Sequence, residues 1–215
     1  MPTRKLLWLL LALTLALTAV WAPGSAMAAT NLCKEAMKSC EAGKKYPSGT
    51  EFKATSGAVT IKVGSLTVKC DGSTLNFKTT ALEGAPLTGE VLEFTFNGCT
   101  GCTSVTAIHL NYKLEIERTI PDFAGLSISK AAAGNPAIKL GSCTGGVACT
   151  FQAESLSTSL VGGTPAGYAF NNAPMSKEGV GGCTGEAFLS VSYGITFVKE
   201  PGGNWTMNLG VWPEA

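Results

Sequence analysis

Residues 105–117 have the sequence VTAIHLNYKLEIE, the clearest alternation of apolar and polar side chains in the chain. Successive side chains of a β-strand point to opposite faces, so a period of two predicts a strand with one buried and one wet side. The expected buried face carries Ile108, Leu110, Tyr112, Leu114 and Ile116, and the expected wet face carries His109, Asn111, Lys113, Glu115 and Glu117. The stretch therefore indicates an amphipathic, half-buried strand.

The same period recurs along the chain, and short alternating runs are separated by turn signals rich in Gly, Pro and Asn. Two further apolar faces are expected to pack into the core: Ala187, Leu189, Val191, Tyr193, Ile195 and Phe197, and then Trp205, Met207, Leu209 and Val211. This pattern predicts an all-β fold, an antiparallel β-sandwich (Ig-like or jelly-roll-like) of about ten strands. A β-barrel is the alternative.

One helix is expected, a short N-terminal one over Leu32–Gly43, with Asn31 as its N-cap and Gly43 as its stop. It carries Cys33 and Cys40, which a continuous helix would separate by about 10.5 Å of rise. A disulfide needs Cα atoms within about 7 Å. We therefore expect the helix to break before Cys40 and a local bridge to form; pairing of each cysteine elsewhere is the alternative.

The N-terminus predicts export. Arg4 and Lys5 precede the apolar run Leu6–Val20, and Ala26-Met27-Ala28 supplies small residues at a cleavage site. This is the pattern of a secretory signal peptide. The predicted organisation is a signal peptide over residues 1–28, a cysteine-containing segment over 29–49 and a single β-sandwich domain over 50–215. The expected location is secreted, extracellular or in the cell wall.

Net charge and hydropathy limit the kinds of partner that the chain is expected to bind. Without Arg4 and Lys5, 14 of the 16 basic residues remain beside 15 acidic ones, a net charge of −1. Such a chain does not attract nucleic acid. After residue 28 no apolar run approaches the roughly 20 residues of a membrane-spanning helix. The expected partner is a cell-wall or extracellular glycan or a protein.

Eight cysteines in an exported chain predict crosslinks rather than thiols. Zinc is disfavoured, because structural sites need two cysteine pairs or a histidine pair and the chain has one histidine; no metal or cofactor is predicted. If Cys99 and Cys102 were a reducible pair, the protein would be a thiol oxidoreductase, the second alternative function. The predicted pairing is Cys33 with Cys40, Cys99 with Cys102, Cys143 with Cys149, and Cys70 with Cys183.

Several short motifs carry a resemblance: Leu32-Cys33, Cys40, Tyr46-Pro47-Ser48-Gly49-Thr50, Val68-Lys69-Cys70, Pro86-Leu87-Thr88-Gly89-Glu90, Phe96-Asn97-Gly98-Cys99 and Gly182-Cys183. In this order they resemble a group of small, uncharacterised secreted proteins of Gram-positive soil bacteria. The resemblance implies one exported all-β domain. It implies no activity and transfers no functional residue.

The leading functional hypothesis is a non-catalytic binding or structural module. Its candidate ligand face is formed by side chains expected on the surface, namely His109, Lys113, Glu115, Glu117 and Trp212. The alternative is a secreted polysaccharide hydrolase, since Glu115 and Glu117 lie about 7 Å apart along one strand face, near the carboxylate spacing of glycosidases. A working pair flanks a cleft from two elements, which is the structural test of that alternative.

Overall fold

The computed structural model describes residues 30–36, 40–81, 84–120, 122–179, 182–183, 185–208 and 210–213; the predicted signal peptide lies outside them. The fold is all-β, as predicted. The elements are β1 (Leu32–Cys33), a 3-10 turn η1 (Ala42–Lys44), β2 (Glu51–Ser56), β3 (Val59–Val63), β4 (Leu66–Cys70), β5 (Gly72–Thr79), β6 (Leu87–Asn97), β7 (Cys102–Ile108), β8 (Tyr112–Ile120), β9 (Phe123–Ser129), β10 (Ala137–Cys143), β11 (Val147–Gln152), β12 (Ser155–Val161), β13 (Gly167–Glu178), β14 (Ala187–Lys199), β15 (Thr206–Met207) and β16 (Trp212–Pro213).

Eight antiparallel strands close into a barrel in the order β14-β2-β5-β6-β8-β9-β12-β13, and β13 pairs back onto β14. The predicted sandwich is therefore wrong, and its alternative, the barrel, describes the fold. Alternation of apolar and polar side chains is the same in both architectures, because each buries one face of every strand. The deciding feature is the closing pair of strands, which local sequence does not encode.

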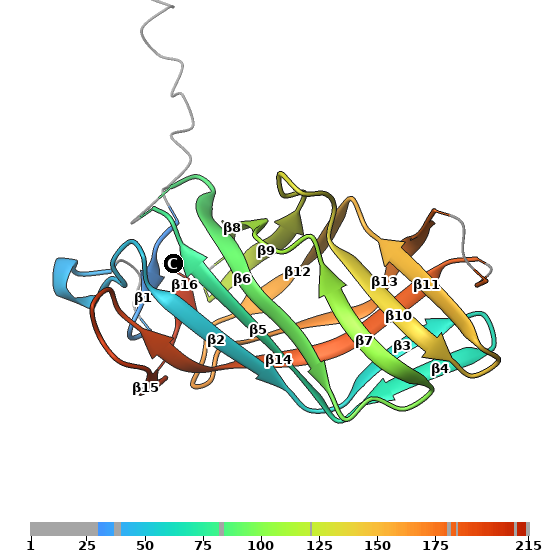
Figure 1. The fold of residues 1–215 in the computed structure, drawn as a ribbon. Helices are drawn as coiled ribbons and strands as arrows, with labels where there is room; N and C mark the ends of the chain where they lie inside the picture. Colours follow the sequence, from blue (N-terminus) through green and yellow to red (C-terminus); the bar gives the residue numbers. More distant parts are fainter. Residues whose placement is uncertain are drawn as a thin grey trace, which may run out of the picture.

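Five further strands extend the barrel, because β13 and β14 are longer than the barrel needs (Figure 1). The first part of β14 pairs with β3, which pairs with β4. The last part of β13 pairs with β11, followed by β10 and β7. Register shifts in β13 and β14 mark bulges, which bend strands and increase their twist.

The stretch 105–117 forms two strands instead of the expected one. His109 and Asn111 adopt positive φ angles of 64° and 65°, which turn a corner between β7 and β8. At this corner the chain leaves the extension, where β7 pairs with β10, and enters the barrel between β6 and β9. The buried positions change from odd numbers, such as Val105, to even numbers, such as Leu114.

The predicted helix is not present in the described part of 32–43. Leu32 and Cys33 instead form β1, which pairs with β16, and only η1 is helical in this segment. Residues 37–39 lie outside the described residues. Sheet pairing supplies backbone partners here, and tertiary pairing of this kind overrides a weak local helix signal.

Side chains fill the barrel and the extension. Fully buried residues come from nearly every long strand, the largest being Tyr112, Phe52, Phe77, Phe151, Phe170, Ile61, Leu75, Leu87, Leu114, Ile116, Leu126 and Ile128. A barrel of about eight strands has an interior just wide enough to be filled in this way. The interior is a packed core, so ligand sites must be sought at its ends and on its outer surface.

The last strands depart from the expected core faces. The bulge after Ile195 puts Val198 inside and leaves the Phe197 side chain 39% exposed. Trp205 and Met207, both expected in the core, are 39% and 73% exposed. Val211 is buried as expected, and Leu209 lies outside the described residues. A one-residue bulge reverses which side chains face inward, and periodicity alone does not locate it.

Candidate binding site at the end of the barrel

All eight cysteines form disulfides: Cys33–Cys40, Cys70–Cys99, Cys102–Cys143 and Cys149–Cys183. The predicted local bridge between Cys33 and Cys40 is confirmed. The other three predicted pairs are wrong, because spacing along the sequence does not show which strands become neighbours. Four disulfides are typical of proteins that fold in an oxidising environment.

The other three disulfides crosslink strands of the extension to each other or to neighbouring loops. Cys102 and Cys143 are register partners on β7 and β10. Cys70 ends β4 and bonds to Cys99, next to the backbone bridge between Lys69 and Thr100. Because Cys99 and Cys102 bond to different partners, the Cys-x-x-Cys stretch is not a redox pair, and the basis of the thiol oxidoreductase hypothesis is removed.

The predicted ligand face is only partly assembled. Lys113, Glu115 and Glu117 share the outer face of β8, where Lys113 Nζ lies 2.6 Å from Glu115 Oε1. In register beside Glu115 come Ser127 of β9 and then Ser157 of β12, under a depression of about 180 Å³. Both glutamates belong to one strand, so this face does not supply the carboxylates from two elements that the hydrolase alternative requires.

The other two members of that face lie elsewhere. His109, expected on the wet side of a strand, lies half-buried at the corner between β7 and β8, with Nδ1 3.3 Å from the Asn135 carbonyl oxygen. Trp212, expected to be exposed, is half-buried in β16, where its register partner is Cys33 and its ring occupies the space beside Gly162. Neither residue joins the polar face of β8.

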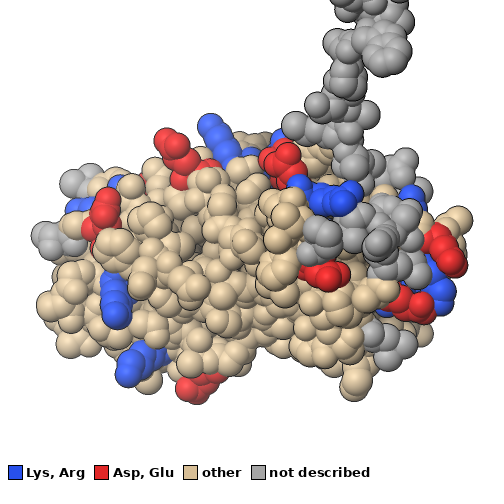
Figure 2. Space-filling view, turned by 180° about the vertical axis from the view of Figure 1, so that it is seen from behind, with Lys and Arg blue, Asp and Glu red and all other residues tan. Residues whose placement is uncertain are grey.

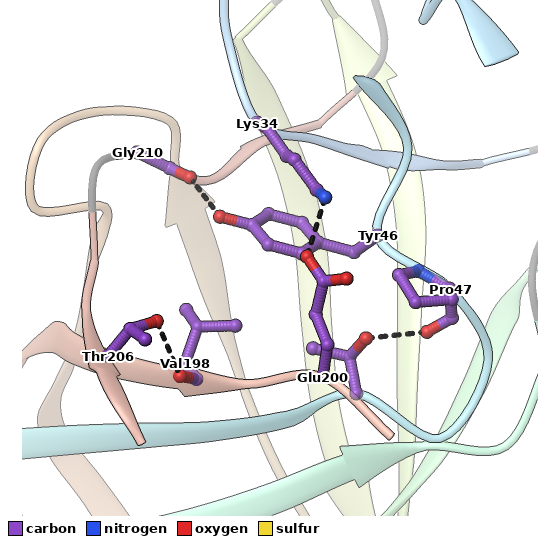
Figure 3. Close-up of polar contacts among 8 residues, drawn as sticks. Lys34, Tyr46, Pro47, Val198, Glu200, Thr206 and Gly210 are labelled. Carbon is purple, nitrogen blue, oxygen red and sulfur yellow. Dashed lines mark hydrogen bonds and ion pairs between the residues drawn. The ribbon is translucent and has the colours of Figure 1, made fainter. Parts of the chain in front are cut away.

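A hollow of about 560 Å³ lies at one end of the barrel, between the N-terminal segment and the β14–β15 ribbon. Its sides come from three parts of the chain: Lys34, Glu35, Gly43, Lys44 and Tyr46 from the N-terminal segment that contains the Cys33–Cys40 disulfide, Val198 and Glu200 at and just after the end of β14, and Thr206 and Met207 of β15. Figure 3 shows how Lys34, Tyr46 and Glu200 come together from these parts of the chain. The hollow offers both polar groups and an aromatic ring.

Tyr46 forms the buried base of this hollow. Its hydroxyl donates a hydrogen bond to the Gly210 carbonyl oxygen at 2.7 Å (Figure 3). The rings of Tyr46 and Phe52 pack in a T-shaped arrangement with centroids 5.2 Å apart. Burial and, to a smaller extent, the charge of Glu200 raise the pKa of Tyr46 to about 12. The phenol therefore stays protonated at any physiological pH.

The charged groups of the hollow are paired. Lys34 Nζ lies 2.5 Å from Glu200 Oε1 and 5.5 Å from the centroid of the Tyr46 ring. Lys44 pairs with Glu35, and this hydrogen bond raises the pKa of Lys44. Thr206 Oγ1 donates to the Val198 carbonyl oxygen at 3.1 Å. The arrangement presents fixed polar groups around an apolar base, which suits ligand binding.

Sequence analysis missed this site because its walls are far apart in the chain. Lys34, Tyr46 and Glu200 meet only once β14 has closed the barrel and β1 has paired with β16. The resemblance includes Tyr46-Pro47-Ser48-Gly49-Thr50, but a turn motif gave no reason to assign a ligand contact to its tyrosine.

The tyrosines predict a specific response to alkaline pH. Burial raises the pKa of all four, Tyr46, Tyr112, Tyr168 and Tyr193, above the ordinary value of 10.0. The folded state thus holds these protons more tightly than the unfolded state, so their contribution to stability is complete below pH 10 and is lost as the pH rises toward 12. Denaturant unfolding at stepped pH should show this decline, and phenolate absorbance should appear with unfolding. Reversible ionisation of all four near pH 10 in the native protein would contradict the assignment.

Comparison with known proteins adds no relative: no family model matches the chain, and neither does any curated protein or solved structure. Within the described ranges, no three His, Cys, Asp or Glu side chains group closely enough to hold a metal ion. Nor does that part of the chain contain a helix long and apolar enough to cross a membrane.

Proposed function

We propose that this chain is an exported, disulfide-stabilised protein that acts outside the cell, in the cell wall or released from it, as a non-catalytic binding module. The hollow at the end of the barrel is its binding site, and an extracellular glycan is the expected partner. The proposal draws on the four disulfides for location and on the chemistry of the hollow for activity. A molecule without a membrane helix in its described part is compatible with either location.

One observation carries the binding role: the polar groups of the hollow are held in fixed bonds. A general acid or base must exchange its proton near the working pH. Burial raises the pKa of the Tyr46 phenol to about 12, so this group keeps its proton at physiological pH. Lys34 and Glu200 neutralise each other's charge in an ion pair of 2.5 Å. Such groups orient a ligand through hydrogen bonds while the Tyr46 ring and Met207 contribute apolar contact.

The surface charge does not favour a nucleic acid as the partner. Figure 2 shows a face of the molecule with a broad uncharged centre, around which Lys or Arg and Asp or Glu side chains lie intermixed, several of them next to a group of opposite sign. The described residues of this face form no cluster of basic side chains of the kind on which nucleic-acid binding relies. Hydroxyl-rich polysaccharides need no such cluster.

We expect the oxidised protein to bind at least one polysaccharide of a panel without releasing reducing sugar from it. The panel is insoluble cellulose, chitin and xylan, on which retention is measured, and soluble polygalacturonate. Lys34→Met should weaken that retention severalfold. The exposed Lys34–Glu200 pair contributes at most about 1 kcal/mol to stability, so the variant should remain folded. Lys62→Met on β3, an exposed lysine outside the hollow, is the matched control.

Two results would count against this function. Reducing sugar released by the wild type and abolished in Glu115→Gln or Glu117→Gln would establish the hydrolase instead. Absence of retention on every polysaccharide of the panel would remove the glycan-binding role.

A further inference from the structure

An exposed aromatic surface lies on the outer side of the β14–β15 ribbon, beside the hollow. Phe197 of β14 is the register partner of Met207 of β15 on one side and of Lys53 of β2 on the other. Direct partners share a face of the sheet. Trp205, just before β15, lies beside them, because its ring is within reach of the Lys53 ammonium group. Trp205 and Phe197 are each 39% exposed, and Met207 is 73% exposed. We call Trp205, Phe197, Met207 and Lys53 the platform.

Two ammonium groups adjoin the indole of the platform. Lys53 Nζ lies 5.7 Å and Lys199 Nζ 5.9 Å from the Trp205 ring centroid, within the range of a cation–π contact. Lys199 also pairs with Glu51 at 3.3 Å. Lys53 has no carboxylate partner among the described residues. The platform thus combines an exposed aromatic ring with one uncompensated positive charge.

We propose that the platform binds an acidic sugar unit, a uronate of an extracellular polysaccharide. The apolar face of the sugar ring would lie against Trp205 and Phe197, and its carboxylate would pair with Lys53 in a charge-assisted hydrogen bond. This inference rests on the proposed glycan-binding function and names the chemistry of one subsite. Met207 borders both the platform and the hollow, so one polysaccharide chain is able to occupy both.

The charge around the platform favours a sugar over an anionic membrane surface. Binding to anionic lipid needs several basic residues acting together. Lys199 is compensated by Glu51 and Lys34 by Glu200. Among the described residues of the platform, Lys53 is therefore the one ammonium group without a carboxylate partner, which suffices for one carboxylate of a ligand.

The same strand provides a matched control pair. Phe188 of β14 is 37% exposed and is the register partner of Lys62 of β3, as Phe197 is of Lys53. No tryptophan contact with Lys62 is present among the described residues. Variants at Phe188 and Lys62 therefore remove an equivalent exposed aromatic ring and an equivalent lysine without touching the platform.

The test is calorimetric titration of the oxidised protein with polygalacturonate and with its fully methyl-esterified form, which has the same backbone without the charge. We expect the acid form to bind about tenfold more tightly, because only its carboxylate forms an ion pair with Lys53 and the ester cannot. Trp205→Ala and Lys53→Gln should each weaken binding of the acid form by about tenfold. Added salt should weaken wild-type binding more than that of Lys53→Gln.

Three outcomes would overturn the assignment of the platform: equal binding of the acid and the ester, equal losses in Phe188→Ala or Lys62→Gln, or binding to vesicles of anionic lipid in place of polygalacturonate. If the protein is retained by cellulose, chitin or xylan through Lys34 but ignores polygalacturonate, only the platform assignment fails. If the protein binds none of these polysaccharides, both the platform assignment and the proposed function fail. All four substituted side chains are at least partly exposed, so loss of folding does not obscure the comparison; far-UV and near-UV circular dichroism verifies this.

Discussion

Phe52→Ala is expected to lower the free energy of unfolding by about 3–5 kcal/mol, the usual cost of removing a buried aromatic side chain and leaving a cavity. Phe52 is fully buried and lies in one cross-strand row with Val198 and Phe77. Its ring stacks on Phe77 with centroids 5.1 Å apart and meets the edge of Tyr46. The row lies inside the barrel beneath the hollow and is packed on both sides of Phe52, so few neighbours are free to move into the space.

Chemical denaturation of the purified protein with its disulfides intact measures this effect. Phe188→Ala is the control, because a partly exposed ring on β14 should change stability by no more than about 0.5 kcal/mol. Similar losses in the two variants would mean that Phe52 is not in a packed barrel interior, and the closed arrangement of β14, β2 and β5 would have to be revised.

The second large effect is expected from the disulfide between Cys102 and Cys143. On the chain-entropy model, a bridge across a sequence separation of 41 lowers the entropy of the unfolded chain and so stabilises the folded state by about 4 kcal/mol. The double variant Cys102→Ala/Cys143→Ala should lose about this much. Alanine avoids burying a new hydroxyl at two sites that are only 7% and 4% exposed. Thermal and denaturant unfolding are the measurements.

The double variant Cys33→Ala/Cys40→Ala serves for comparison. Its bridge spans only seven residues, so the same model assigns it a smaller contribution of about 2–3 kcal/mol. If it destabilises the protein more than loss of the Cys102–Cys143 bridge does, the extension is not the part of the molecule that depends on crosslinking. In that case β7 and β10 would be held by their backbone pairing alone.

Local sequence predicts the faces of strands but not their partners. The alternation at Ala187, Leu189, Val191, Tyr193 and Ile195 predicted one buried face, and all five side chains are buried. The same rule failed beyond Ile195, where a bulge moves Phe197 outward, and at His109 and Asn111, where positive φ angles turn the chain between two sheets. Bulges and corners depend on which strands meet, and that information is spread over the whole chain.

The candidate site illustrates the same limit. Chemistry-bearing residues that are close in sequence, such as Glu115 and Glu117, were easy to select, yet they share a flat strand face. The hollow joins Lys34 to Glu200, and the platform joins Lys53 to Trp205, each pair separated by more than half of the chain. Trp205 was expected in the core because it alternates with the apolar residues Met207 and Leu209. In the structure β15 pairs with β14 at the edge of the sheet, and Trp205 is partly exposed to solvent.

Disulfide mapping of the purified, unreduced protein is the decisive experiment for the structural role of its cysteines. Stepwise partial reduction, alkylation and peptide mass spectrometry assign each pair, including those of the closely spaced Cys99 and Cys102. The structure predicts four bridges, Cys33–Cys40, Cys70–Cys99, Cys102–Cys143 and Cys149–Cys183, and no thiol that labels before reduction. Free thiols in the native protein, or a peptide in which Cys99 is bonded to Cys102, would contradict the account and return redox chemistry to first place.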